Sequence, residues 1–295
     1  MKEQGIRFGK AGHLAGTLTL ADPAGDVGLV LPSAGLLHRI GPHRLHVRLA
    51  RLAASRGVSS IRFDMPGIGD SDAAPGRAPY AEQELQASRM ATEVLEQSAG
   101  CRRFILAGLC SGADSACLAA LHDSRACALF LMEPHFYPGP LSAPLRILRR
   151  LREYGLLRAA MRIRQRLAEG ALPGAHPAAD QDRELPPAPE FAAELATLEA
   201  RGVHLRLLYA GSGMGVLDLR RHRRRVFGNL ASSPRFAIEL LPRADHLFTP
   251  ASEVRTLEQQ FLALLDAATG ANVAPSADDA MPARATAAVS QAARV

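Results

Sequence analysis

The segment Phe104-Ile-Leu-Ala-Gly-Leu-Cys-Ser-Gly112 leads an apolar strand directly into a tight turn, and a helix-forming sequence follows. Cys110 lies midway between Gly108 and Gly112, two residues from each. A turn this sharp presses its flanks against neighbouring backbone, where a Cβ would collide and glycine fits. The spacing therefore predicts that the turn presents Cys110. It does not predict this for Ser111, which has no glycines at the same spacing.

Apolar runs alternate with helical patterns on both sides of this turn, after a β-hairpin expected near the N-terminus within residues 8–20. Buried strands are predicted at 26–32, 59–64, 102–107, 126–132, 204–210 and 236–241. Helices are predicted at 43–56, 80–97, 111–122, 217–227 and 252–265. This alternation indicates an α/β fold with a mostly parallel central sheet that helices cover on both faces.

The alternation breaks once, and this predicts the domain organisation. Residues 1–134 and 201–270 form the α/β core, and 135–200 read as a helical lid with a proline-rich return. The tail 271–295 is rich in Ala, Pro and Ser and has few apolar anchors, so it is expected to be disordered. A chain of 295 residues suits one large domain with such an insertion.

The basic charge is concentrated in the predicted lid. Residues 141–170 contain eight arginines and two glutamates, an excess that equals the whole net charge of +6. A nucleic-acid partner is not expected, because no aromatic residues for base stacking are interleaved and tryptophan is absent. The simplest interpretation is that these arginines lie on a solvated helix face and bind nothing. The functional interpretation is that they form a docking surface for an acidic acyl carrier protein or for CoA phosphates.

Cysteine usage and the N-terminus predict a cytoplasmic protein without a metal or other cofactor. The four cysteines show no paired spacing and read as free thiols in a reducing compartment. Motifs such as C-x-x-C and H-E-x-x-H are absent. The first residues have no apolar signal region, and no apolar run reaches the ~20 residues that a membrane span needs.

Four segments occur in an order that resembles a known superfamily. They are Gly35-Leu-Leu-His-Arg-Ile-Gly-Pro-His-Arg44, Arg62-Phe-Asp-Met-Pro-Gly-Ile-Gly-Asp-Ser71, Gly108-Leu-Cys-Ser-Gly-Ala113 and Ala244-Asp-His-Leu-Phe-Thr249. Together they look like α/β-hydrolases with a cysteine in the nucleophile elbow. They are most similar to the small hydrolases that accompany exosortase and thiotemplate biosynthesis systems in bacteria. The resemblance covers about residues 5–268 apart from much of the lid, and it implies the α/β-hydrolase fold.

The resemblance also implies the catalytic roles. Cys110 would attack an acyl carbonyl as a thiolate, favoured by a helix N-terminus and a nearby imidazole. His246, 136 residues downstream, would accept the thiol proton and later activate the acceptor. The Ser111 backbone N–H would stabilise the oxyanion, with a second amide near Gly35 or Leu36. The alternative is that Cys110 is a small apolar side chain and His246 a structural loop residue.

The acid of the triad is open at this point. The resemblance leads one to expect a carboxylate soon after the strand ending at Ala210, where Gly211 to Val216 hold none. Asp218 lies a few residues late and is the first candidate. Glu133, after the strand 126–132, is the second. A Cys–His pair can also act without an acid.

The role of Arg44 and the type of reaction each remain open. Arg44 could bind a substrate carboxylate or phosphate, or it could pair with Asp64 or Asp70 to join two loops.

Three functions remain for a protein that takes a small-molecule acyl substrate. They are a thioesterase or acyltransferase with an acyl-Cys110 intermediate, a carboxylesterase or peptidase of the same fold, and a catalytically silent binding scaffold. Nothing in the sequence indicates the oligomeric state.

Overall fold

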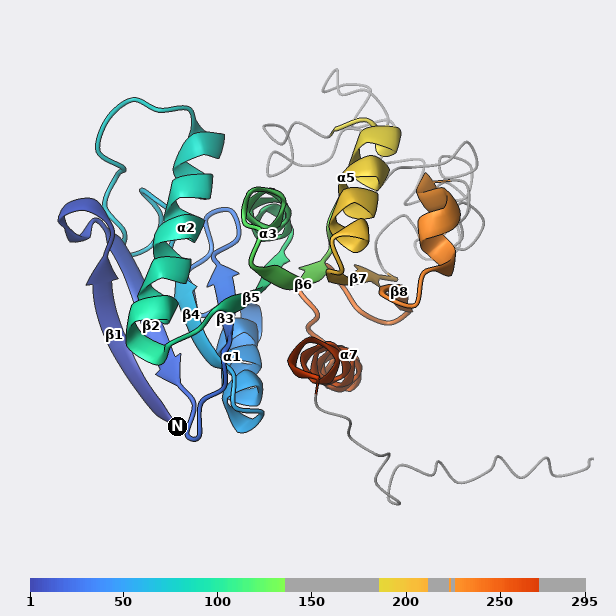
Figure 1. Cartoon of the computed structure of the whole chain (residues 1–295), viewed down its shortest axis with the longest axis horizontal. Helices are drawn as coiled ribbons and strands as arrows, with labels where there is room; N and C mark the ends of the chain where they lie inside the picture. Colours follow the sequence, from blue (N-terminus) through green and yellow to red (C-terminus); the bar gives the residue numbers. More distant parts are fainter. Residues whose placement is uncertain (136–185, 212–222, 224–225, 271–295) are drawn as a thin grey trace, which may run out of the picture.

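The computed structural model describes residues 1–135, 186–211, 223 and 226–270. In this part of the chain eight strands form one sheet in the order β1-β2-β4-β3-β5-β6-β7-β8 (Figure 1). The antiparallel edge consists of β1 (Lys2–Phe8), β2 (Leu14–Leu20) and the pairing of β2 with β4 (Ser59–Phe63). From β4 onward all pairs are parallel, through β3 (Val27–Pro32), β5 (Arg103–Leu109), β6 (Ala126–Met132), β7 (His204–Ala210) and β8 (Phe236–Leu241).

Helices cover both faces of the sheet. One face carries α2 (Tyr80–Ala99), α3 (Ser111–His122) and α5 (Ala188–Ala200), and the other carries α1 (Leu45–Ser55) and α7 (Ala251–Thr269) (Figure 1). Short 3-10 turns occur at η1 (Lys10–Gly12), η2 (Pro42–Arg44) and η4 (Gly228–Ser232). The mostly parallel, helix-flanked sheet that the alternation predicted is confirmed.

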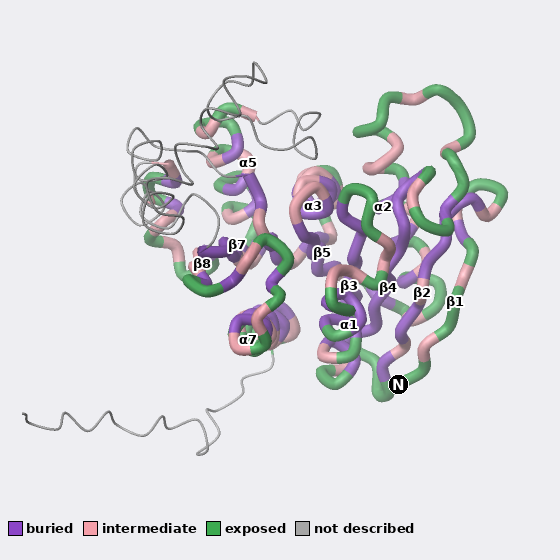
Figure 2. Tube along the Cα trace, turned by 180° about the vertical axis from the view of Figure 1, so that it is seen from behind, coloured by how far each residue is buried: buried purple, intermediate pink, exposed green. Residues whose placement is uncertain are grey.

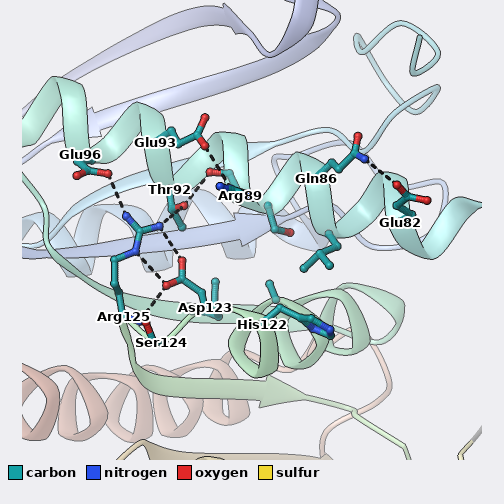
Figure 3. A pocket seen from close by; sticks show the side chains of 14 residues that line it. Glu82, Gln86, Arg89, Thr92, Glu93, Glu96, His122, Asp123, Ser124 and Arg125 are labelled. Carbon is teal, nitrogen blue, oxygen red and sulfur yellow. Dashed lines mark hydrogen bonds and ion pairs between the residues drawn. The ribbon is translucent and has the colours of Figure 1, made fainter. Parts of the chain in front are cut away.

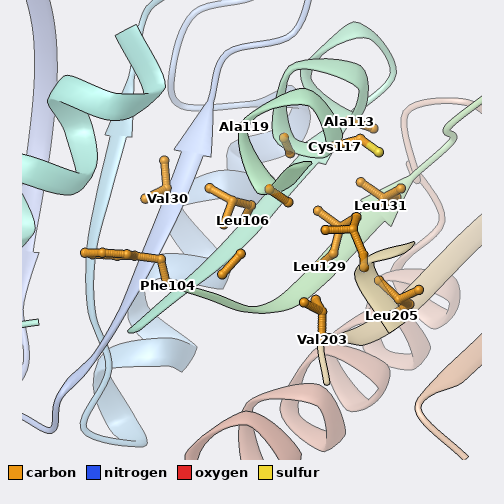
Figure 4. Close-up of a cluster of buried hydrophobic side chains, with 14 of the residues drawn as sticks. Val30, Phe104, Leu106, Ala113, Cys117, Ala119, Leu129, Leu131, Val203 and Leu205 are labelled. Atoms are coloured by element: carbon orange, nitrogen blue, oxygen red, sulfur yellow. The ribbon is translucent and has the colours of Figure 1, made fainter. Parts of the chain in front are cut away.

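The central strands are buried on both faces (Figure 2). Alternate residues of β5 enter different clusters: Phe104 and Leu106 pack toward α2 and α3, whereas Ile105 and Leu109 pack toward α1 and α7. Figure 4 shows Leu106 among side chains of the first cluster, beneath α3. Because both faces need apolar side chains, β5 and β6 read as continuous apolar runs in the sequence.

The turn after β5 has the geometry that its glycines predict. Cys110 has φ 53° and ψ −122°, a conformation that L residues rarely adopt, and α3 begins at the next residue. A Cβ on Gly108 would lie 2.0 Å from the carbonyl oxygen of Gly112. Gly112 in turn lies under β3, where an added Cβ would meet the Ser33 carbonyl oxygen at 3.2 Å. The strand and the helix can therefore approach this closely only with a glycine at position 108.

The predicted elements agree with the structure where it describes them, with ends shifted by a few residues. The hairpin begins earlier than expected, since β1 starts at Lys2. Of the predicted lid 135–200, the structure describes only its ends. There α5 packs on α3 and β7 and buries Phe191, Leu195 and Leu198. The rest of the lid with its arginines, most of the helix predicted at 217–227, and the tail lie outside the described residues.

Among the described helices, none combines the length and apolarity that a membrane span requires.

Replacing Gly108 with Ala should destabilise the fold, because its Cβ would collide with the backbone of Gly112. We expect the free energy of unfolding to fall by at least about 2 kcal/mol in denaturant titrations. Gly5→Ala is the matched control, since nothing lies within 4 Å of a Cβ there. Equal stability of the two variants would contradict the close-approach argument.

Candidate functional site

The residues that the sequence singled out meet at the carboxyl edge of the sheet. Cys110 follows β5, Glu133 follows β6, and His246 follows β8. The loop of residues 33–41, here called the oxyanion loop, follows β3, which pairs with β5. Ligand sites of open α/β sheets lie at this edge, because the loops after parallel strands converge there.

Cys110, His246 and Glu133 form one hydrogen-bonded chain. The Nδ1 of His246 lies 3.0 Å from Oε2 of Glu133, and the imidazole also hydrogen-bonds the side chain of Cys110. The other carboxylate oxygen of Glu133 accepts a hydrogen bond from the backbone N–H of Ala210, at the end of β7. Glu133 is thus fixed by the sheet on one side and holds the histidine on the other.

The electrostatics favour a protonated histidine. The hydrogen bond to Cys110, then that to Glu133, raises the pKa of His246 to about 10, against the lowering effect of burial. The Glu133 side chain is 13% exposed and that of His246 52%. An imidazolium between a carboxylate and a sulfur is the arrangement that stabilises a cysteine thiolate.

Glu133, the second candidate for the acid in the sequence analysis, lies beside His246. Glu133 makes the contact with His246 that a triad acid makes. Asp218, the first candidate, lies outside the described residues. Glu133 has φ 52°, and its N–H donates to the Leu208 carbonyl oxygen, which continues the β6–β7 ladder by one residue. The left-handed conformation of a glutamate at a strand end is a strain that marks functional positions.

The predicted oxyanion donors lie next to the thiol. The backbone N–H of Ser111 is the first amide of α3, and it has no carbonyl within the helix to which it can donate. Gly35 donates its N–H to the Ser111 side-chain oxygen at 2.7 Å. The Leu36 N–H makes no hydrogen bond to the described residues, and the same holds for the Ala34 and His38 amides, so Leu36 is one of three amides of this loop that remain available.

Arg44 does not join the loops. It is exposed, has φ 63°, and forms no ion pair with the described residues. Arg39 makes the connection instead: its guanidinium lies 2.5 Å from Oδ2 of Asp64 and 2.8 Å from Oδ2 of Asp70. The pairing considered for Arg44 therefore belongs to Arg39, because Arg44 closes the turn η2 with its side chain pointing to solvent. A role of Arg44 in substrate binding stays a prediction.

His38, Asp64 and Asp70 are the one group of described residues with the spacing of metal ligands. The Arg39 guanidinium already lies on both carboxylates, and the Arg39 backbone N–H donates to Asp64. A metal ion would have to displace this arginine. The cluster is best understood as an ion-pair network that joins the oxyanion loop to the loop after β4.

The three other thiols are chemically different from Cys110. Burial raises the pKa of Cys101 and of Cys127 to about 11, and it raises the pKa of the deeply buried Cys117 as well. These side chains pack in or against the two apolar clusters. Cys110 alone among the cysteines has a histidine partner.

A cavity of about 700 Å³ lies away from these residues, between α2 and α3 (Figure 3). Arg125 bridges it, with ion pairs to Asp123 at 2.8 Å and to Glu96 at 3.0 Å, and Arg89 pairs with Glu93. None of the three triad-like residues lines this cavity. Both of its arginines are paired with carboxylates of its own wall, so it offers no unpaired cation to a ligand.

Arg39→Ala should destabilise the chain, because it removes the cation from the fully buried Asp64 carboxylate. We expect a loss of about 2–3 kcal/mol in the free energy of unfolding, since Asp64 keeps two backbone donors. Arg44→Ala, the matched control on the same loop, should change it by less than about 0.5 kcal/mol. A larger loss for Arg44→Ala would reverse the assignment.

The His246 imidazole should titrate well above the ordinary histidine pKa of 6.5. Its proton stabilises the folded state below pH 6.5, and this contribution disappears as the pH rises toward 10. Glu133→Gln removes the carboxylate charge and should lower the His246 pKa. The check is an NMR titration of the imidazole carbon-bound protons, with His246→Gln for assignment. A pKa near 6.5 in the unmodified protein would contradict the arrangement.

No family model and no curated protein matches the sequence, but solved structures do. An α/β serine hydrolase without a lid from Xanthomonas campestris is 14% identical, with a TM-score of 0.54 over 92% of this chain and 98% of its own. An esterase from Pyrococcus furiosus is 12% identical, with a TM-score of 0.57 over 91% and 92%. A hypothetical protein from Pseudomonas aeruginosa is 22% identical, with a TM-score of 0.54 over 90% and 98%. At these identities the likeness concerns the fold: the chain has the α/β-hydrolase fold.

Proposed function

We propose that this protein is an acyl-transfer enzyme, a thioesterase or an acyltransferase, that works through an acyl-Cys110 intermediate. One observation carries the proposal: Cys110, His246 and Glu133 are hydrogen-bonded in series at the carboxyl edge of the sheet. In this order they match the roles of nucleophile, general base and orienting acid.

The first half-reaction transfers the acyl group to the enzyme. The Cys110 sulfur, with its proton on His246, attacks the acyl carbonyl, and the π electrons move to the carbonyl oxygen. The Ser111 amide and an amide of the oxyanion loop stabilise that charge. The carbonyl re-forms, the donor leaves as a thiolate, and His246 protonates it. The products are acyl-Cys110 and the free donor thiol.

The second half-reaction releases the acyl group. Neutral His246 takes a proton from water, an alcohol or an amine, and the acceptor attacks the thioester of acyl-Cys110. Glu133 holds the imidazole orientation and stabilises its positive charge in both steps. Collapse of the intermediate expels the Cys110 thiolate, which restores the ion pair with His246. Hydrolysis and transfer differ only in this acceptor.

Acyl thioesters suit this nucleophile and this surface. Exchange of one thioester for another is near neutral in energy, whereas forming a thioester from an ester is uphill. Exposed large apolar side chains gather on the two loops beside Cys110, namely Leu36, Leu37, Ile40 and Leu247. An apolar rim of this kind favours the aliphatic part of an acyl group over a charged one. CoA and an acyl carrier protein are the donors proposed, with carrier docking on the basic segment 141–170.

A carboxylesterase is the second candidate. The observation that favours it is the likeness to a solved esterase, which shares the fold at 12% identity. A silent binding scaffold is the third candidate. The ion pair of His246 with Glu133 argues against it, because an unused ion pair of this kind costs desolvation energy.

Intact-protein mass spectrometry after incubation with acyl-CoA and acyl-carrier-protein thioesters tests the proposal. The unmodified protein should gain the mass of the acyl group, and Cys110→Ala should gain none. Turnover by Cys110→Ala, or the absence of any adduct together with consumption of ester substrates alone, would overturn the thioester proposal.

The same assay assigns the acid. Glu133→Gln should lower kcat by about 100-fold or more, because the His246 imidazolium loses the carboxylate that orients and stabilises it. Asp218→Asn serves as the matched variant and should retain kcat. The opposite result would transfer the role to Asp218.

A further inference from the structure

The Ser111 side chain makes a contact that its main-chain role does not require. Its hydroxyl oxygen accepts a hydrogen bond of 2.7 Å from the backbone N–H of Gly35, which is 76 residues away in the sequence. Ser111 is the first residue of α3, directly after Cys110. The bond therefore joins the nucleophile turn to the oxyanion loop.

The tip of the oxyanion loop has few other anchors. Its start is held at Ser33, whose N–H donates to the Phe63 carbonyl oxygen at 2.9 Å. Its end is held by the pairing of Arg39 with Asp64. Between these anchors the His38 side chain contacts Asp70 at 3.3 Å, the Leu37 N–H bond is local, and Leu36 is 89% exposed. Among the described residues, the Gly35–Ser111 bond is the hydrogen bond that ties this tip to the elbow.

Gly35 can adopt the backbone conformation that this contact needs. Its φ of 49° lies in the left-handed region, and an added Cβ would come within 3.8 Å of the Ser111 oxygen. A Leu37 N–H bond to the Ala34 carbonyl oxygen, at 2.8 Å, closes the turn around it. With the Gly35 amide committed to Ser111, the amides on either side of it, Ala34 N–H and Leu36 N–H, are the neighbouring donors left for a developing oxyanion.

We infer that the Ser111 hydroxyl is a positioning residue for catalysis: by accepting from Gly35 it holds the oxyanion loop in register with Cys110. This inference rests on the proposed function, because an oxyanion arises only if Cys110 attacks a carbonyl. Ser111 then acts twice, with its own amide on the oxyanion and with its hydroxyl on the loop that supplies the second amide. A donor displaced by about 1 Å loses most of its benefit in the transition state.

The competing interpretation predicts the opposite change in the rate of acyl transfer when the Ser111 hydroxyl is removed. The Ser111 oxygen could occupy the place of the oxyanion itself, so that a substrate would have to displace it. Removing the hydroxyl would then accelerate acyl transfer. The two interpretations are separated by the direction of one rate change.

The kinetic arm compares Ser111→Ala, Ser111→Thr and Ser115→Ala on an activated acyl thioester. Ser111→Ala should lower kcat by about 10- to 100-fold with little change in KM. Ser111→Thr keeps the hydroxyl and should recover most of the rate. Ser115 is one turn along the same helix and donates to Glu84, so Ser115→Ala controls for the loss of a hydroxyl from α3. A faster Ser111→Ala, or one equal to the unmodified enzyme, overturns the inference.

Alkylation separates positioning from damage to the nucleophile. Iodoacetamide reacts with Cys110 without forming an oxyanion, so Ser111→Ala should be alkylated at the unmodified rate. Slower alkylation would place the effect on the thiol and would also overturn the inference.

Hydrogen exchange provides an arm that does not depend on turnover. Ser111→Ala should exchange the amides of residues 34–38 faster than the unmodified protein, whereas Ser115→Ala should not. If the unmodified protein reacts with no acyl donor, the proposed function fails while this arm still reports on the loop. Unchanged exchange in Ser111→Ala would show that the hydroxyl does not hold the loop.

Discussion

The approach of β5 to α3 at Gly108 and Gly112 is the constraint on which the site depends. The backbone of Gly112 lies where a Cβ of residue 108 would be, so the chain can reverse within one residue. That residue is Cys110, which adopts a backbone conformation that few residues other than glycine tolerate and projects from the end of the strand. Its amide donates to the Met132 carbonyl oxygen, which fixes the elbow to β6. The residue after Met132 is Glu133, so the same contact that fixes Cys110 also places the carboxylate.

The sheet order explains why distant segments meet. β5 is flanked by β3 and β6, so the loop after β3 lies on one side of Cys110 and Glu133 on the other. The histidine arrives from β8, two strands beyond β6, and reaches Glu133 across the end of β7. The Ala210 amide at that strand end supports the carboxylate between them. Parallel strands make this convergence general, since all their carboxyl ends lie at one edge.

The sequence predicted the elements and the sharp turn at Cys110 well, and the reasons are local. β5 and β6 are continuous apolar runs because both faces are buried, and glycine spacing marks a turn directly. Contacts between residues far apart in the sequence were harder to predict. In the sequence, Arg39 and Arg44 are two similar arginines five residues apart. Only the turn at η2 decides which of them contacts the buried Asp64. Glu133 ranked second because its contact with His246 depends on strand order, which periodicity does not reveal. The Gly35–Ser111 bond gave no sequence signal, since it joins a glycine amide to a serine hydroxyl.

The contrast among the four thiols has a practical consequence. Cys101 and Cys117 are buried and Cys127 is half-buried, and burial raises the pKa of all three thiols, whereas the Cys110 side chain hydrogen-bonds His246. With Cys110 as the proposed nucleophile, a thiol-specific reagent used under native conditions should react with one cysteine of the four. The fraction of chains that take up one equivalent would then measure the competent fraction of any preparation, before a substrate has been identified.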